Sequence, residues 1–485
     1  MDITKELKNQ HLMWRAGFGP SAVGARESLA YSPHTLFKSL DKSSVRSPRA
    51  IEVVDNSANG LMLGLKQVSN QTSLEAAEEK KRLLKQSQQE IQQLNLAWIR
   101  EMISGEDQFR EKIALFWHGH FASRNLNVYY QQLLLDVIRQ NALGRFSDLL
   151  YGVSKSAAML HFLNNVQNRK DHPNENFARE VMELFTMGRG HYSEQDVKEA
   201  ARAFTGWSAN PGGEFQFHRF QHDAGVKSFL GRTGNFDGDD ILAILLEEKQ
   251  TARFISTKIY RFFVNDEPDP ERVEWLATRF FQSQYDIRRL MEDLFTSEWF
   301  YESRNIGTRV KSPVEWLVGI RRMLPMILEN ENSQILIQRL LGQLLFYPPN
   351  VAGWPGGLNW IDSSTLMFRL QIPKILYQGN EWSVKAKADD DQEMGMRESP
   401  DDQAHRAKLK NGQSFRASID WESYFRRYDG IADEELVSAV LQTLVPGAQG
   451  LQESTVRKYM DRLNRESLLK TATIQIMSTP EFQMC

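Results

Sequence analysis

Long stretches with helical periodicity, separated by short breaks rich in glycine and proline, dominate this sequence. Apolar residues at spacings of three and four predict a helix in each of the ranges 73–105, 110–121, 128–143 and 146–162. Further helices are predicted between 251 and about 345 and between 420 and 482. A chain with this pattern buries apolar stripes of helices against one another. The sequence therefore predicts a mainly α fold, a large multi-helix assembly.

Two segments interrupt the helical pattern. One is rich in Gly, Phe and His, and the alternation of Phe215 and Phe217, followed by Phe229, predicts a small β-hairpin excursion. The other, residues 382–415, is full of charged and amide side chains and nearly free of aromatics. Such a composition buries too little apolar surface to offset the entropy of ordering the chain. We therefore expect a disordered or mobile insertion there.

The insertion also sets the expected domain organisation. We expect a main helical body at residues 1–381, the charged insertion at 382–415, and C-terminal helices at 416–485 that pack back on the body. No internal repeat of fixed period is visible in the sequence.

Composition excludes several classes of protein. The 59 basic and 62 acidic residues give a net charge of −3, so no general attraction to nucleic acid is expected. The only cysteine, Cys485, excludes a disulfide framework, a thiolate zinc site and an iron–sulfur cluster built by this chain alone. The sequence has no run of about 18 apolar residues, so no membrane span is predicted. The N-terminal residues lack a basic segment followed by an apolar one, so we expect a cytoplasmic protein.

The first group of candidate functional residues lies in Phe116-Trp117-His118-Gly119-His120-Phe121. Two histidines so close together suggest a metal site. However, each helical residue turns by about 100°, so His118 and His120 lie about 200° apart on opposite faces. We expect one of them to face a polar pocket and the other to be held by a backbone carbonyl. A purely structural role for at least one of them is the alternative.

The second group follows Pro173-Asn174, where a helix is predicted to begin and to continue to about Gly188. Asn176, Arg179, Glu180 and Glu183 are three or four residues apart and should share one stripe. Two carboxylates beside an amide and an arginine indicate a ligand site. The alternative is an ordinary solvated face, because Arg179 is four residues from both Glu175 and Glu183.

A second polar stripe is predicted on the next helix, which begins with a capping-box pattern at Ser193. Asp196, Glu199 and Arg202 are spaced by three, and a short connection makes the two helices neighbours. Further along the chain, His222-Asp223 combines an imidazole with a carboxylate that would orient it, although adjacent residues seldom pair in this way.

Several standard signatures are absent from the sequence. It contains no Gly-x-Gly-x-x-Gly, no Walker-type lysine loop, no His-Glu-x-x-His and no Gly-x-Ser-x-Gly. A calcium loop beginning at Asn235 is rejected, because Asp240 stands where that loop needs Gly and Leu246 where it needs Glu. The stretch from Pro348 to Gly357 predicts a stiff loop anchored by tryptophan.

Several of these motifs together resemble the large bacterial family catalogued as domain of unknown function 1800. The resemblance rests on the following runs, in this order: Arg15-Ala16-Gly17-Phe18-Gly19-Pro20, Phe116-Trp117-His118-Gly119-His120-Phe121, Asn174-Glu175-Asn176-Phe177-Ala178-Arg179-Glu180, Ala201-Arg202-Ala203-Phe204-Thr205-Gly206-Trp207, His222-Asp223, Lys311-Ser312-Pro313 and Pro348-Pro349-Asn350-Val351-Ala352-Gly353-Trp354. It spans nearly the whole chain and implies a bacterial, mostly α-helical protein. Many members of that family look exported, and some carry His where this chain has Phe185.

Two hypotheses of function follow from these residues. In the first, the chain is an enzyme whose helical core holds a polar pocket, lined by His118 or His120, Asn176, Arg179, Glu180, Glu183 and the His222-Asp223 pair. Carboxylates and imidazole would transfer protons, and Arg179 would clamp an anion. His118, Glu180 and Glu183 would suit a divalent metal, namely zinc, manganese or iron, for hydrolytic or oxidative chemistry.

In the second hypothesis, the chain is a non-catalytic binding or assembly scaffold. Its polar helices would then specify the fold, and the Trp354 loop and the charged insertion would meet a partner protein or a polar polymer such as a glycan. The enzyme hypothesis depends on one condition: an imidazole at 118 or 120 and the acids at 180 and 183 must face one enclosed space.

Overall fold

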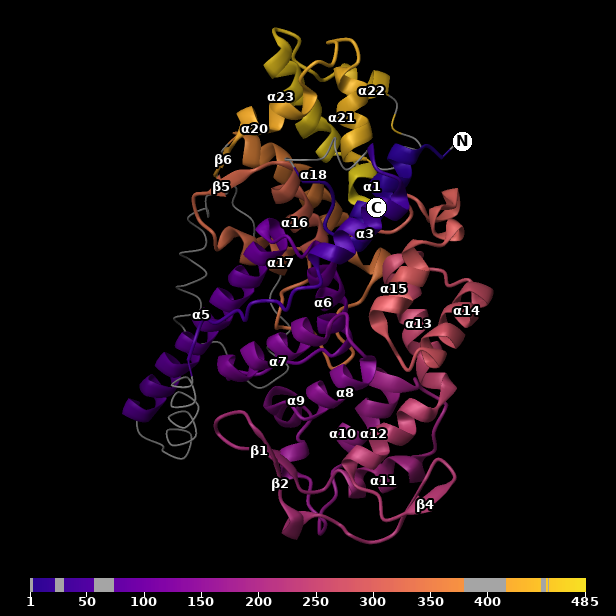
Figure 1. Cartoon of the computed structure of the whole chain (residues 1–485). Helices are drawn as coiled ribbons and strands as arrows, with labels where there is room; N and C mark the ends of the chain where they lie inside the picture. The colour runs from indigo at the N-terminus through magenta and orange to yellow at the C-terminus, as the bar shows by residue number, and fades with distance from the viewer. Residues whose placement is uncertain (1–2, 22–29, 56–73, 379–415, 446–450, 452) are drawn as a thin grey trace. The chain divides into compact units, whose positions relative to one another are not determined.

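A computed structural model describes residues 3–21, 30–55, 74–378, 416–445, 451 and 453–485 of the chain. Helices account for most of this part, which confirms the predicted mainly α fold (Figure 1). In the described residues, no helix has the length and apolar character needed to cross a membrane. The predicted insertion at 382–415 lies outside the described residues.

The contacts group the chain into two compact units. Unit 1 comprises residues 1–36, 301–344 and 355–485, and unit 2 comprises residues 37–300 and 345–354. Residues 416–485, predicted to pack back on the body, share unit 1 with the N-terminal residues. The predicted domain limits at 381 and 416 remain a prediction.

Unit 2 carries all the candidate site residues. Its helices are α5 (Leu74–Ser104), α6 (Gln108–His120), α7 (Val128–Asn141), α8 (Phe146–Ser154), α9 (Ala157–Phe162), α10 (Glu175–Glu180), α11 (Glu194–Ala203), α12 (Gly238–Glu247), α13 (Lys249–Phe263), α14 (Pro270–Gln282) and α15 (Ile287–Phe295). Helix α3 (Pro33–Ser43) crosses the limit between the units.

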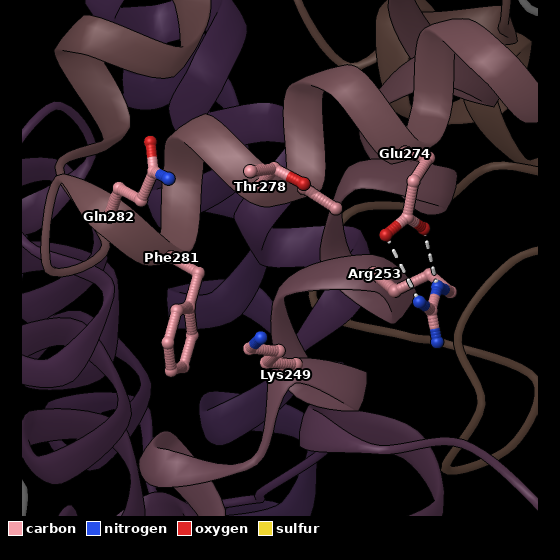
Figure 2. Close-up of a pocket in the computed structure, with 7 residues that line it drawn as sticks. Lys249, Arg253, Glu274, Thr278, Phe281 and Gln282 are labelled. Atoms are coloured by element: carbon pink, nitrogen blue, oxygen red, sulfur yellow. Dashed lines mark hydrogen bonds and ion pairs between the residues drawn. The ribbon is translucent and has the colours of Figure 1, made fainter.

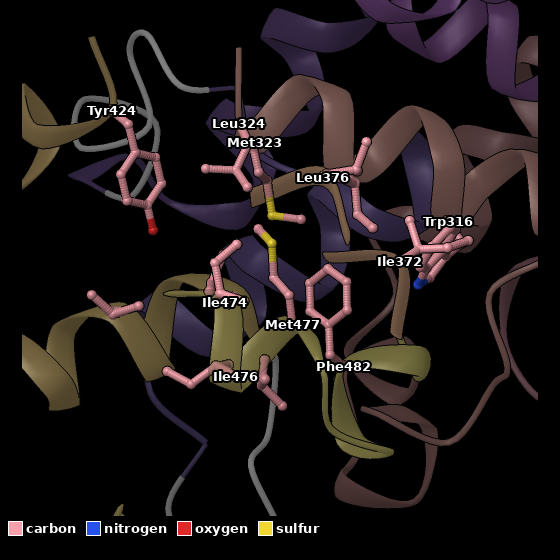
Figure 3. Packing of buried hydrophobic residues seen from close by; sticks show 14 of the residues in the cluster. Trp316, Met323, Leu324, Ile372, Leu376, Tyr424, Ile474, Ile476, Met477 and Phe482 are labelled. Atoms are coloured by element: carbon pink, nitrogen blue, oxygen red, sulfur yellow. The ribbon is translucent and has the colours of Figure 1, made fainter. Parts of the chain in front are cut away.

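Unit 1 has the remaining helices and a small sheet. Its helices are α1 (Lys5–Ala16), α16 (Pro313–Met323), α17 (Ser333–Leu340), α18 (Ser363–Gln378), α20 (Trp421–Phe425), α21 (Leu436–Leu444), α22 (Glu453–Arg457) and α23 (Arg465–Met477). Strands β5 (Met326–Leu328) and β6 (Ala417–Ile419) pair antiparallel. The core of this unit is apolar, and Figure 3 shows Met323 and Met477 pointing toward one another within it.

The helix boundaries follow from local capping. Ser193 starts α11 with a capping box, as predicted, because its hydroxyl accepts from the backbone N–H of Asp196 while that carboxylate accepts from Ser193. The predicted single helix over 146–162 is wrong. Ser156 accepts from the backbone N–H of Met159 and so starts a second helix, α9, after α8 has ended.

The predicted β-excursion consists of two hairpins. Strands β1 (Trp207–Ala209) and β2 (Phe215–Phe217) pair antiparallel, with Trp207 opposite Phe217. Strands β3 (Lys227–Phe229) and β4 (Arg232–Gly234) form the second pair. Phe229 therefore belongs to a different hairpin from Phe215 and Phe217.

The helix predicted from 174 to about 188 changes its winding partway. Helix α10 ends at Glu180, and residues Val181–Thr186 form a π-helical turn. The Thr186 hydroxyl reinforces the wider turn by donating to the Val181 carbonyl at 2.7 Å. A spacing of three or four residues therefore no longer places side chains on one stripe beyond Glu180. Such π-helical turns are frequent at functional sites.

Candidate functional site

His118 is enclosed by aromatic side chains near the end of α6. Its ring lies 5.1 Å from Trp98, 5.0 Å from Phe346 and 5.4 Å from Trp354, measured between ring centres. Its Nε2 accepts a hydrogen bond of 3.3 Å from the backbone N–H of Phe346. Burial lowers the pKa of this imidazole from 6.5 to about 3, because the charged form would lose its hydration. His118 is therefore neutral near pH 7.

Two residues that precede Trp354, Phe346 and Gly353, have unusual backbone conformations. Phe346 has a positive φ of 68°, which costs free energy for a residue with a side chain. Gly353 also has a positive φ, of 85°, and a Cβ there would lie 2.4 Å from the Gly119 carbonyl oxygen. The loop thus lies directly against the end of α6, and a glycine is needed for that close approach.

His120 has a different partner. Its Nε2 lies 3.2 Å from the Phe185 carbonyl, so Nε2 carries the proton and donates. Its Nδ1 is buried and has no hydrogen-bond partner among the residues that the structure describes. Burial, and secondarily the charge of Lys258, hold the pKa of His120 well below its usual value. The expected backbone carbonyl is present, but in the part of the chain that the structure describes neither histidine contacts a carboxylate.

Glu180 and Glu183 lie on either side of the start of the π-helical turn, in contrasting environments. Glu183 accepts hydrogen bonds from the Tyr192 hydroxyl at 2.8 Å and from Arg189 Nε at 2.9 Å. Glu180 is half-buried, and within the described residues its carboxylate has no hydrogen bond or ion pair. The two carboxylates are therefore near each other, but among the described residues only that of Glu183 has hydrogen-bond partners.

The pKa values of these two acids move in opposite directions. Burial, and then the charge of Glu183, raise the pKa of Glu180. Burial also acts to raise the pKa of Glu183, but the hydrogen bonds from Tyr192 and Arg189 outweigh it and the net pKa is lowered. At neutral pH Glu183 is ionised, while Glu180 is the more easily protonated of the two.

Arg179 and Asn176 do not join these acids. Arg179 forms ion pairs with Glu194 at 2.7 Å and with Glu175 at 3.2 Å, and the hydrogen bonds with Glu194 raise its pKa. The Asn176 side chain donates to the Leu163 carbonyl at 3.1 Å. The pairing with Glu175 matches the ordinary intrahelical alternative, and the guanidinium fork of Arg179 is already occupied.

The second polar stripe forms a network that joins α11 to β3. Arg202 forms ion pairs with Glu199 at 2.9 Å and with Asp223 at 2.7 Å. The hydrogen bond from Arg202 lowers the pKa of Asp223. Glu199 also accepts from the backbone N–H of Ser228 at 3.1 Å. The buried Lys227 ammonium donates to the backbone carbonyls of Asp223 and Gly225. These contacts hold the β-hairpin segment on the helix.

His222 and Asp223 do not act on each other, although they are adjacent in sequence. The His222 Nδ1 lies 3.0 Å from the Thr205 carbonyl. The Asp223 carboxylate faces Arg202, and its backbone N–H donates to the Thr205 hydroxyl at 2.8 Å. Thr205 therefore organises this pair.

Arg189 and Tyr192 bind Glu183 but were not among the site residues predicted from the sequence. They lie in the turn between the π-helical turn and α11, where Gly188 and Gly190 have φ values of 81° and 86°. These two glycines let the chain reverse so that both side chains reach Glu183. The signal that could have revealed them is the Gly188-Arg189-Gly190 spacing, which marks a tight turn after a helix.

Within the described ranges, no three His, Cys, Asp or Glu side chains gather in an arrangement able to hold a metal ion. The predicted set of His118, Glu180 and Glu183 therefore remains a prediction from the sequence.

The family model described as "Protein of unknown function (DUF1800)" matches residues 11–484. No curated protein and no solved structure matches the chain.

Proposed function

Since the chain belongs to the family described as a protein of unknown function (DUF1800), whose name specifies no reaction, we propose its function from the site alone: acid–base hydrolysis of a polar substrate, with Glu180 as the proton-transfer group beside the ionised Glu183. The observation that carries this proposal is the unbound, half-buried carboxylate of Glu180, one turn from a carboxylate that two donors hold in place.

The contrast between the two acids supports the proposal. Enzymes that perform acid and base chemistry at neutral pH often pair carboxyl groups whose surroundings move their pKa values apart. Here burial and a neighbouring anion raise the pKa of Glu180, while Tyr192 and Arg189 lower that of Glu183. A protonated Glu180 would give its proton to the leaving oxygen as the bond to that oxygen breaks. The resulting carboxylate would then take a proton from the attacking water.

Glu183 and its partners would act as positioning and electrostatic groups. The Glu183 anion keeps the pKa of Glu180 high and stabilises positive charge that develops on the substrate. The Tyr192 hydroxyl and Arg189 fix the orientation of the Glu183 carboxylate.

The histidines have a structural role in this proposal. His118 holds the loop through Phe346, and His120 holds the π-helical turn through Phe185. The zinc, manganese or iron site predicted from the sequence at His118, Glu180 and Glu183 is a separate alternative, in which His118 would be a metal ligand instead of a structural residue. Elemental analysis of the purified protein tests that alternative, with metal expected to be lost in both Glu180→Ala and His118→Ala variants that still fold.

The acid–base proposal is tested with a panel of chromogenic nitrophenyl esters, glycosides and phosphates. For a probe that the wild-type protein hydrolyses, Glu180→Gln should lower kcat by about a hundredfold or more, the usual contribution of a general acid or base. Glu175→Gln is the matched control, because Glu175 is on the same helix but binds Arg179. Full activity in Glu180→Gln would refute the assignment.

A second measurement tests whether Glu183 and its partner Tyr192 influence the reaction or only the stability of the fold. Tyr192→Phe removes one of the hydrogen bonds that lower the pKa of Glu183, so the limb of the pH–rate profile that reports the acid pair should move. A lower rate with an unchanged profile would assign Tyr192 to stability alone.

One observation favours the assembly scaffold as a second function. The arginines of both stripes are already occupied, Arg179 by two glutamates and Arg202 by Glu199 and Asp223. These ion pairs would determine how the helices and hairpins pack on one another. The function of the chain would then be to bind a partner protein or a polar polymer through its surface. If this function is correct, Arg202→Met lowers the melting temperature, while Glu180→Gln changes neither stability nor any measurable turnover.

A further inference from the structure

A small pocket lies between α13 and α14, on elements that carry none of the acid–base residues. Its volume is about 240 Å³. Figure 2 shows Phe281, Lys249, Thr278 and the Arg253–Glu274 pair arranged around it. A pocket of this size suits a small organic molecule, because sites for drug-sized ligands begin at about 300 Å³.

The sequence places the lining residues on two helix faces. On α14, the lining residues Ala277, Thr278, Phe281 and Gln282 lie three, four, seven and eight residues after Glu274, so all five share one face. On α13, Lys249 and Arg253 are four residues apart and face them. The two helices are direct neighbours (Figure 1), so the pocket is a fixed feature of their packing.

The charges in this pocket are not balanced. Arg253 forms two hydrogen bonds with Glu274, from Nε to Oε2 at 2.8 Å and from a terminal nitrogen to Oε1 at 3.1 Å. This pair is neutral overall, and the guanidinium fork is occupied. The Lys249 ammonium has no hydrogen bond or ion pair with any residue that the structure describes, although its charge, after the hydrogen bond and charge of Arg253, helps to lower the pKa of Glu274. Two cations and one carboxylate line the pocket, so its net charge is positive.

Part of the pocket lining is apolar. Ala277 is buried, and the Phe281 ring is half-buried and borders the pocket near Lys249 (Figure 2). The Thr278 hydroxyl and the Gln282 amide add neutral hydrogen-bonding groups to the lining. Beside the Arg253–Glu274 pair, the lining thus offers one further cation, an aromatic ring and two neutral polar groups, and polar groups of this kind orient a ligand in small-molecule sites.

We propose that this pocket binds a small organic carboxylate with an apolar group. The carboxylate lies against the Lys249 ammonium, and the apolar group covers Phe281 and Ala277. A carboxylate fits better than a phosphate for two reasons. The Lys249 ammonium provides only one positive charge. The guanidinium of Arg253, which could form paired hydrogen bonds with a phosphate, is already bound to Glu274. Binding here does not depend on the proposed reaction at Glu180.

Calorimetric titration of the full chain with benzoate, acetate and inorganic phosphate tests the proposal. Benzoate should bind, and Lys249→Met should weaken its binding about tenfold or more, because the charge-assisted hydrogen bond is lost. Phe281→Ala should weaken benzoate binding as well. Lys198→Met is the matched control, because Lys198 is an exposed lysine on α11, and it should leave binding unchanged.

Each outcome decides for or against the proposal. Circular dichroism first establishes that each variant folds, which is expected because Lys249 is exposed. Benzoate binding that is lost in Lys249→Met and kept in Lys198→Met supports the site. Three results overturn it: no benzoate binding to the wild-type protein, equal binding to Lys249→Met, or binding of acetate and phosphate as tight as that of benzoate, which would show that the apolar face contributes nothing.

Discussion

The substitution Gly353→Ala tests how the aromatic loop is held against α6. Two costs add at this position. The backbone has a positive φ of 85°, which an alanine adopts at a cost of about 1–2 kcal/mol. The new Cβ would also lie 2.4 Å from the Gly119 carbonyl oxygen, and relieving such overpacking costs about 1–3 kcal/mol. We therefore expect a total destabilisation of about 2–5 kcal/mol.

Gly190→Ala is the matched control for the backbone cost. Gly190 has nearly the same φ, 86°, but a Cβ there meets no atom within 4 Å. This variant should lose only the conformational part, about 1–2 kcal/mol. The difference between the two variants isolates the contact with Gly119, and we expect it to be about 1–3 kcal/mol.

Differential scanning calorimetry of the full chain measures this difference. A loss of 1 kcal/mol lowers the melting temperature of a large domain by about 2–4 °C. The two units of the chain can melt in separate transitions, so the transition that shifts in both glycine variants is the one to compare. Equal melting temperatures for Gly353→Ala and Gly190→Ala would refute the close approach of the loop to the end of α6.

Two further predictions concern buried charged groups. Arg139 and Glu111 form a fully buried ion pair at 2.8 Å, so Glu111→Gln should lower the free energy of unfolding by about 3–5 kcal/mol. Glu79→Gln, at an exposed pair, should leave it nearly unchanged; similar losses for the two variants in chemical denaturation would contradict this. Burial lowers the pKa of His118 from 6.5 to about 3, so the unfolded chain binds more protons between these values and stability falls as the pH drops below about 6.5. His118 contributes about 2 kcal/mol to this loss at pH 5, and His120, whose pKa burial also lowers, adds a loss of its own. The pH slope should therefore be reduced but not abolished in His118→Gln and unchanged in a variant of the exposed His191; an unchanged slope in His118→Gln would contradict the reasoning.

The candidate site was predicted in part. Sequence spacing identified Glu180 and Glu183 and the ordinary pairing of Arg179 with Glu175, because such pairs depend only on neighbours along a helix. It did not reveal that Tyr192 and Arg189 bind Glu183, since that contact depends on how the chain reverses after Gly188. The spacing of residues therefore could not predict which of the two acids has no hydrogen-bond partner.

The fold shows the same difference between features set by neighbouring residues and features set by distant ones. The mainly α architecture and the capping box at Ser193 follow from local periodicity and from hydrogen bonds within a few residues, so the amino-acid sequence determines them directly. The π-helical turn at 181–186 and the burial of both histidines of α6 were decided by packing. His118 meets a loop more than 200 residues away in the chain, and His120 meets the carbonyl of Phe185. No local sequence pattern predicts such contacts, because the free energy of burying an imidazole depends on which distant segments fold against it.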